Sequence, residues 1–209
     1  MYIHIKEYVF EFNNGNDSKS IEKLFNSIND YLHKEELHFS YLVIDGEEIY
    51  DNFDRYMFEN IENIKKVEVV ALTLLEMVNE SILSIEQYAK NAIPIINKIA
   101  EEFYQKPKED TWSQLTDLFE GVQWIIQSLV QINSIENSND IVSDYEIWNE
   151  YVQEVTKFSE IIPELENAVL NNDNVLVGDM LLYEVIPVFE IMVEKLGILI
   201  SEAVDKDVN

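Results

Sequence analysis

The chain has 209 residues, with 14 Lys and Arg against 41 Asp and Glu, a formal net charge of -27. Hydrophobic residues make up 47% of it, enough for a buried core and too many for disorder throughout. Because phosphate neutralisation needs clustered cations, nucleic acid is nearly excluded as a partner. The chain has no cysteine, which excludes disulfides, a thiolate nucleophile and Cys-ligated zinc.

Nothing in the sequence indicates export or membrane insertion. Residues 1–7 lack the basic region, apolar stretch and cleavage site of a signal peptide. The most apolar stretch, residues 175–200, contains five charged residues, which predicts a buried helix and not a spanning one. Anionic membrane surfaces would also repel the chain. We therefore expect a cytoplasmic protein with no membrane partner.

The N-terminal half begins with an alternating pattern that predicts two short strands. Ile3 and Ile5 lie in one phase, and the alternating aromatic residues from Tyr8 to Phe12 lie in the other. A one-residue slip reverses the face on which side chains lie, so the change of phase at Lys6 and Glu7 predicts a hairpin turn.

The rest of this half predicts a helix among further strands. Asp45-Gly46 is a strong hairpin signal, because both residues adopt positive φ readily. The expected elements, in order, are a loop at residues 13–17, a helix at 21–32, strands at 39–43 and 47–49, a short helix at 53–57 and a strand at 67–71.

This order of elements resembles the β-grasp (ubiquitin-like) fold. The resemblance is closest from Tyr41 to Thr73, covers about a third of the chain and includes no catalytic motif. The family's modifier members end in a free Gly-Gly tail, whereas residues 71–73 here lead directly into a helix, so conjugation is not implied. The resemblance does imply a small sheet used as a protein-docking surface.

From Leu74 onward the apolar period becomes helical. Heptad assignment predicts a buried seam from Leu75 to Phe103 in the first helix, and one in the second at Trp112, Leu115, Phe119, Val122, Ile126 and Leu129. Capping boxes at Thr111–Gln114 and Ser143–Glu146 and polar loops at residues 137–140 and 171–174 separate four long helices. Short loops between long helices require antiparallel neighbours. The predicted fold class is therefore α+β, with a β-grasp-like domain at residues 1–73 and an acidic, antiparallel, up-down four-helix bundle at residues 74–209.

Three Ile-Pro sequences lie inside the predicted helices, at Pro94, Pro163 and Pro187. Proline removes one helical hydrogen bond and bends the helix. Two interpretations remain: curvature that wraps the bundle around its core, or a groove opened at the bends.

The sequence offers no catalytic, metal or cofactor site. His4, His33 and His38 all precede the bundle, and without a Glu-x-x-His pair in its helices a di-iron site is excluded. Residues 33–38 hold a His and Glu cluster that reads as a solvated turn. Phosphate-binding glycine loops and nucleophile motifs do not occur, and the carboxylate pairs read as solvated helix faces. We expect a non-enzyme without a cofactor.

Two features exceed what a monomeric bundle needs. Trp124 falls on an outward position, where it is either a binding hot spot or packed under the N-terminal domain or a loop. The last helix is apolar beyond its seam, at Ile186, Ile191, Val193, Ile198 and Ile200, so it is central or covered by the N-terminal domain or a second copy. The predicted partner-binding residues are Trp124, Ile191 and Ile198.

These features predict a protein–protein interaction module of adaptor or secretion/assembly chaperone type, with a cationic protein or an amphipathic helix as partner. Residues 1–73 carry a net charge of -8 and the remainder -19, which also fits an acidic decoy or immunity-type inhibitor of a cationic protein. An enzyme with an unrecognised carboxylate site and a homodimer formed through the last helix are further alternatives.

Overall fold

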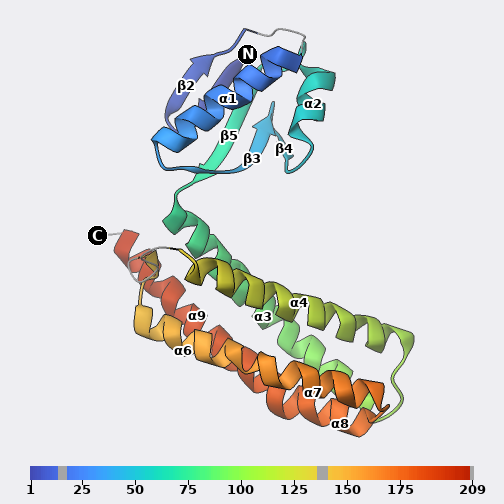
Figure 1. Cartoon of the computed structure of the whole chain (residues 1–209). Helices are drawn as coiled ribbons and strands as arrows, with labels where there is room; N and C mark the ends of the chain where they lie inside the picture. Colours follow the sequence, from blue (N-terminus) through green and yellow to red (C-terminus); the bar gives the residue numbers. More distant parts are fainter. Residues whose placement is uncertain (14–17, 136–140, 208–209) are drawn as a thin grey trace. The chain divides into compact units, whose positions relative to one another are not determined.

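The computed structural model describes residues 1–13, 18–135 and 141–207. The chain divides into two compact units, Met1–Met77 and Val78–Asn209 (Figure 1). The first contains a five-stranded sheet with two helices, and the second contains helices and no strand in its described residues, so the α+β class is confirmed. The loops expected at residues 14–17 and 137–140 lie outside the described residues.

The N-terminal unit is a mixed sheet with strand order β2-β1-β5-β3-β4. β1 is parallel to β5, and the other neighbouring pairs are antiparallel. The elements are β1 (Tyr2–Ile5), β2 (Tyr8–Glu11), α1 (Ser18–Lys34), β3 (His38–Ile44), β4 (Glu47–Ile49), α2 (Phe53–Asn60) and β5 (Lys66–Leu72). This is the element order that the sequence predicts.

One face of the sheet is buried against the helices. Ile3 pairs with Val67 and Ile5 with Val69, and all four side chains share this face with Leu24 and Ile28 of α1 in one core. The opposite face keeps apolar residues at the surface, with Tyr2 54% exposed and Val9 48% exposed.

Both predicted hairpin turns are present. Lys6 follows β1 with φ 49°, so a residue other than Gly or Asn takes the left-handed conformation there. Asp45 and Gly46 have φ of 49° and 97°, as a two-residue hairpin turn between β3 and β4 requires. The Asp45 carboxylate also accepts hydrogen bonds from the backbone N–H of Lys65 (3.1 Å) and Lys66 (2.8 Å), which tie the turn to the start of β5.

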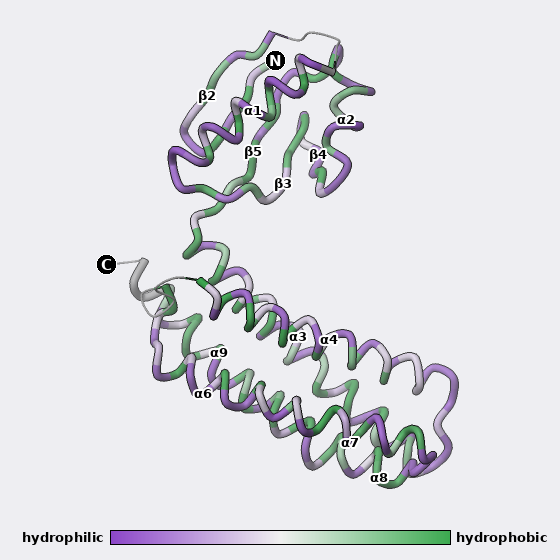
Figure 2. The backbone as a smooth tube through the Cα atoms, viewed as in Figure 1, coloured by the Kyte–Doolittle hydropathy of each residue, from purple (hydrophilic) through white to green (hydrophobic). Residues whose placement is uncertain are grey.

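In its described residues the second unit contains α3 (Leu74–Phe103), which starts in the first unit, α4 (Glu109–Asn133), α6 (Tyr145–Thr156), α7 (Phe158–Leu170), α8 (Asn174–Met180), the π-helical turn η1 (Leu181–Val185) and α9 (Ile186–Asp207). Lys157 alone separates α6 from α7, and its backbone is itself helical. Figure 1 shows α4 running back beside α3, then α6 and α7, then α8 and α9 returning. Hydropathy alternates along each helix in Figure 2, as a shared core requires.

The structure corrects both predicted capping boxes, by three residues at α4 and by one at α6. α4 begins at Glu109, so Thr111 is inside its first turn, where its hydroxyl oxygen accepts from the Lys108 N–H (3.0 Å) and its O–H donates to Glu102. α6 is capped by Asp144, whose carboxylate accepts from the backbone N–H of Glu146 (2.8 Å) and Ile147 (3.0 Å). At α6 the cap is an Asp, one of the favoured N-cap residues, whereas at α4 the N-cap position is Lys108, which cap preference does not indicate.

The predicted seam of α4 is also shifted. Leu118 and Ile125 are buried, whereas the expected seam residues Phe119 and Ile126 are only partly buried against the core. The apolar stripe of α4 is wide enough that periodicity alone does not fix its centre. In α3 the expected seam residues from Val78 to Phe103 are buried, but Leu75 is 47% exposed.

The helices respond differently to their prolines. α3 continues through Pro94 and α7 through Pro163. Before Pro187 the helix widens into η1, and the Ile186 N–H donates to the carbonyl of Leu181, five residues back. In a regular α-helix the N–H of residue 187 would donate to the carbonyl of Tyr183, but proline has no N–H. The wider turn therefore breaks no hydrogen bond at this position.

Candidate functional site

Metal-ligating side chains do not gather into a cluster in the described part of the chain. Residues 1–13, 18–135 and 141–207 contain no group of three or more His, Asp and Glu residues placed to hold a metal ion. Among the helices described there, none has the length and apolarity needed to cross a membrane. The candidate sites are instead surfaces on which apolar side chains lie exposed beside polar ones.

Trp124 lies at the surface of the helical unit, on α4. Its side chain is 39% exposed, and its ring meets that of Tyr88 on α3 edge to face, with centroids 5.8 Å apart. The Tyr88 hydroxyl occupies the space that a Cβ at Gly121 would need. The absence of a side chain at Gly121 therefore lets Tyr88 lie across α4 and support Trp124.

Tyr88 also borders a groove between α3 and α4 of about 290 Å³, the α3/α4 groove. Ile95, which lines it, is 46% exposed. Gln114 lines it too, and its side-chain carbonyl oxygen is buried without a hydrogen-bond partner among the described residues. An unpaired buried acceptor costs free energy, so Gln114 weakens the packing at this groove.

A second groove, of about 340 Å³, lies between α7 and the segment formed by η1 and α9; we call it the α7/α9 groove. Ile191 lines it, beside the buried Ile161 and Val188. Carboxylates and an aromatic ring complete its lining, including Glu154, Glu160, Glu164, Tyr183 and Glu184. The structure thus places one of the three predicted binding residues in a groove with an apolar floor and an acidic rim.

The apolar excess of the last helix is partly consumed inside the unit. Ile186 is buried, and Val193 and Ile200 pack against the core. Ile191 and Ile198 are only partly buried, and Ile198 is not among the residues that line the α7/α9 groove. Much of the circumference of α9 therefore packs inside the helical unit, which agrees with the expectation of a central helix.

The charges around the α7/α9 groove are unbalanced. Lys157 lines the groove but pairs with Glu154 at 2.7 Å. Lys195, one turn beyond Ile191, binds Glu150 (2.7 Å) and Glu194 (3.2 Å), and these hydrogen bonds raise the pKa of the Lys195 ammonium group. In the described part of the chain, Glu160, Glu164 and Glu184 have no cationic partner.

A third cavity, of about 590 Å³, lies between α1 and α2 of the N-terminal unit. Ile21, Phe25 and the 55% exposed Phe58 line it, together with Arg55, which pairs with Glu59 at 2.8 Å. Sequence analysis did not single out this cavity, Tyr88 or Tyr183. A glycine inside a helical pattern was the available signal for the Tyr88 contact, since it often marks close packing.

The helical unit thus belongs to the class of α-helical proteins with grooves between neighbouring helices. The family model described as "Domain of unknown function (DUF8042)" matches residues 80–195, more than half of the chain, and the chain belongs to this family. The matched span includes Trp124 and both grooves of the helical unit but not Ile198. No curated protein and no solved structure matches the chain.

Proposed function

We propose that this chain is a non-enzymatic, cytoplasmic protein–protein interaction module of adaptor or chaperone type. The observation that carries the proposal is Trp124, which is 39% exposed yet held in place by the edge-to-face contact with Tyr88. Tryptophan is enriched among the residues that dominate binding energy, and a ring that is already ordered loses little entropy on binding.

The neighbouring features support the same proposal. The α3/α4 groove adds exposed apolar surface at Ile95. In the N-terminal unit, the exposed Tyr2 and Val9 on the open face of the sheet agree with the docking role that the β-grasp resemblance implies.

Affinity capture from the source cell, followed by mass spectrometry, tests the role of Trp124. We expect Trp124→Ala to reduce recovery of the partner at least about tenfold, as for a residue at the centre of an interface. Val130→Ala is the matched control, because Val130 is 59% exposed on the same helix and outside the α3/α4 groove. Equal recovery with both variants would contradict the role of Trp124.

The charge of the chain supports a second candidate, an acidic inhibitor of a cationic protein. Residues 74–209 hold 26 acidic against 7 basic residues. A complex held mainly by these charges should dissociate as salt screens them, whereas one held by apolar contacts should persist. Repeating the capture at low and high salt separates the two candidates.

A further inference from the structure

The α7/α9 groove has the floor of an apolar binding site. Ile161 and Val188 are 7% and 3% exposed, and Pro187 and Ile191 lie partly buried beside them. The groove is open to solvent between α7 on one side and η1 with α9 on the other. An apolar side chain of a bound molecule would therefore be removed from water on this floor.

Its rim has the charge of a site for cations. Glu160 and Glu164 lie one helical turn apart on α7, and Glu184 lies across the groove in η1. These three carboxylates have no cationic partner in the described residues, so a bound ammonium or guanidinium group would displace no ion pair at them. Tyr183, 73% exposed on the same rim, offers a ring face to a cation.

The π-helical turn contributes to this arrangement. η1 contains Tyr183 and Glu184, and both line the groove that Pro187 and Ile191 continue along α9. π-helical turns inside α-helices are frequent at functional sites, because they change the direction of side chains without ending the helix.

We propose that the α7/α9 groove binds a basic amphipathic helix of a partner protein. The helix places an apolar side chain on the floor near Ile161 and Ile191, and Lys or Arg residues against Glu160, Glu164 and Glu184. Cations one turn apart on a helix match the spacing of Glu160 and Glu164. A second copy of this chain fits the rim poorly, because its net charge is -27. The inference rests on the proposed function and assigns it a site and a class of partner.

The probe is a synthetic peptide of about 18 residues, five helical turns, with Leu along one face and Lys and Arg elsewhere. We would titrate it into the full chain labelled with ¹⁵N, in about 150 mM salt to suppress long-range attraction. A peptide of the same composition in scrambled order keeps the charge but loses the apolar face. We expect the first peptide to shift the amide resonances of Ile161, Tyr183 and Ile191, and the scrambled one to bind at least about tenfold more weakly.

Two charge-matched variants separate the groove from the general acidity of the chain. Glu160→Gln/Glu164→Gln/Glu184→Gln removes three charges from the rim. Glu101→Gln/Glu109→Gln/Glu120→Gln removes three exposed charges from α3 and α4. We expect the rim variant to raise the Kd about tenfold or more and the control variant to change it less than about twofold. Ile191→Ser should weaken binding further, with the fold of each variant checked by circular dichroism.

Each other outcome overturns the inference: no binding of the amphipathic peptide, equal weakening by the two triple variants, or resonance shifts confined to Trp124 and the α3/α4 groove. The proposed function fails separately, since it requires a partner whose capture depends on Trp124. A partner lost with Trp124→Ala but retained by the rim variant would leave the proposed function standing and remove the inference.

Discussion

At the scale of single residues, the burial of Tyr151 in the core of the helical unit carries a cost in free energy. Tyr151 is fully buried on α6, and its hydroxyl has no hydrogen-bond partner among the described residues. Its ring centroid lies 5.0 Å from that of Trp148, whose indole N–H is satisfied by the side-chain oxygen of Asn133 at 3.0 Å. Burial raises the pKa of the Tyr151 hydroxyl, which therefore stays neutral at physiological pH.

Tyr151→Phe should stabilise the protein. The substitution removes the desolvation cost of an unpaired hydroxyl and keeps the packed ring, so we expect the free energy of unfolding to rise by about 1 kcal/mol. Denaturant-induced unfolding measures this. Tyr145→Phe, on a 39% exposed side chain of the same helix, should change stability by less than about 0.5 kcal/mol. A loss of stability with Tyr151→Phe would mean that the hydroxyl has a partner in solution.

Properties of single residues were predictable from the sequence only where they do not depend on tertiary packing. The outward position of Trp124 was predictable from helical periodicity alone, whereas its contact with Tyr88 was not. That Ile191 lies in an acidic groove was not, because Glu160 and Glu164 reach it from a different helix. The unpaired hydroxyl of Tyr151 was equally unpredictable, since a sequence does not show which acceptors lie near a buried side chain.

At the scale of elements, α3 and α4 are fitted to each other at Gly121. A glycine inside a helix normally costs about 1 kcal/mol relative to alanine. At this position alanine would overlap the Tyr88 hydroxyl, so the helix keeps a residue that weakens it in isolation. In return, the glycine leaves room for the Tyr88 ring, which in turn packs against the ring of Trp124.

A double-mutant cycle should expose this coupling. Gly121→Ala alone should displace Tyr88 and change the near-ultraviolet circular dichroism of the aromatic residues, with little gain in stability. In a Tyr88→Ala background the overlap is absent, so the same Gly121→Ala substitution should raise the free energy of unfolding by about 1 kcal/mol. Equal effects of Gly121→Ala in both backgrounds would show that the two positions are independent.

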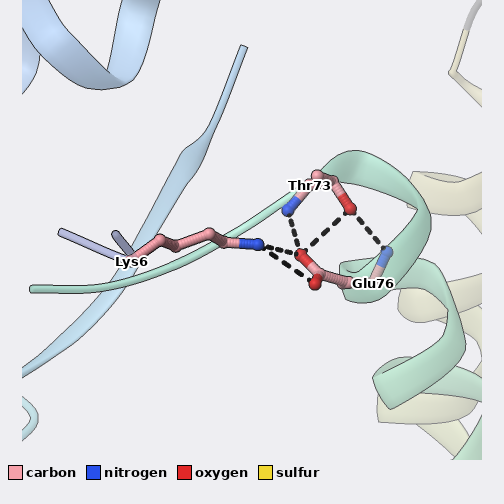
Figure 3. A network of polar contacts seen from close by, with 3 residues as sticks. All are labelled: Lys6, Thr73 and Glu76. Atoms are coloured by element: carbon pink, nitrogen blue, oxygen red, sulfur yellow. Dashed lines mark hydrogen bonds and ion pairs between the residues drawn. The ribbon is translucent and has the colours of Figure 1, made fainter. Parts of the chain in front are cut away.

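The start of α3 is held by a network within the first unit (Figure 3). Thr73 donates its backbone N–H (2.7 Å) and its hydroxyl (3.0 Å) to the carboxylate of Glu76, and the Glu76 N–H donates to the Thr73 hydroxyl oxygen at 3.2 Å. Lys6, in the turn after β1, donates to both carboxylate oxygens at 2.9 and 3.1 Å. Thr73 and Glu76 form a capping box that sequence analysis did not identify.

The network predicts a pH dependence of a definite sign. The hydrogen bond from Lys6, followed by that from Thr73, lowers the pKa of Glu76 below its ordinary value. A carboxyl group whose pKa is lower in the folded state stabilises that state at pH values above its unfolded-state pKa, and this contribution is lost as pH falls. The wild type should therefore exceed Glu76→Gln in stability at neutral pH, by less than about 1 kcal/mol since the pair is exposed. This difference should begin to shrink near the ordinary pKa of about 4.3 and be lost as pH falls through the lower folded-state pKa of Glu76.

Thermal unfolding at several pH values checks this expectation. Glu80→Gln is the control, because Glu80 lies one turn further along α3, is exposed and has no hydrogen-bond or ion-pair partner among the described residues. A pH-dependent difference of the same size for Glu80→Gln would assign the effect to the acidity of the helix and not to Lys6.

The widened turn η1 has a signal in the sequence that heptad spacing does not reveal. Four buried residues, Val177, Leu181, Val185 and Phe189, follow one another at intervals of four. In an α-helix of 3.6 residues per turn such a series drifts around the axis, whereas a wider turn keeps its members on one side. Heptad assignment averages over this difference, so the turn was missed although Pro187 marked its end.

At the scale of the whole molecule, charge is the dominant property. With a net charge of -27, the carboxylates repel one another in the folded state. This repulsion is strongest in residues 74–209, which carry a net charge of -19. Sodium chloride should screen this repulsion, so we expect the melting temperature to rise between low salt and about 0.15 M. A charge-reduced variant such as Glu101→Gln/Glu109→Gln/Glu120→Gln should show a smaller rise. A melting temperature that falls with salt would contradict this expectation.

The architecture was predictable because its signals are local and repeated. The change from alternation to helical spacing near Leu74 gave the α+β class, and the turns at Lys6 and Asp45 gave the strand boundaries. The centre of the α4 stripe and the residues that border each groove were not predictable. They depend on how helices far apart in the sequence rotate against one another, which no single segment encodes.

The hairpin turn at Asp45-Gly46 also affects how the protein ages chemically. In an Asp-Gly sequence the backbone nitrogen of glycine can attack the aspartyl carboxyl group and expel water, and hydrolysis of the resulting succinimide gives aspartate or isoaspartate. Here the Asp45 carboxylate is held by the N–H groups of Lys65 and Lys66, which restrains it from turning toward the Gly46 nitrogen. The folded N-terminal unit thus protects the bond that its own turn requires, and that protection ends when β5 separates from the turn.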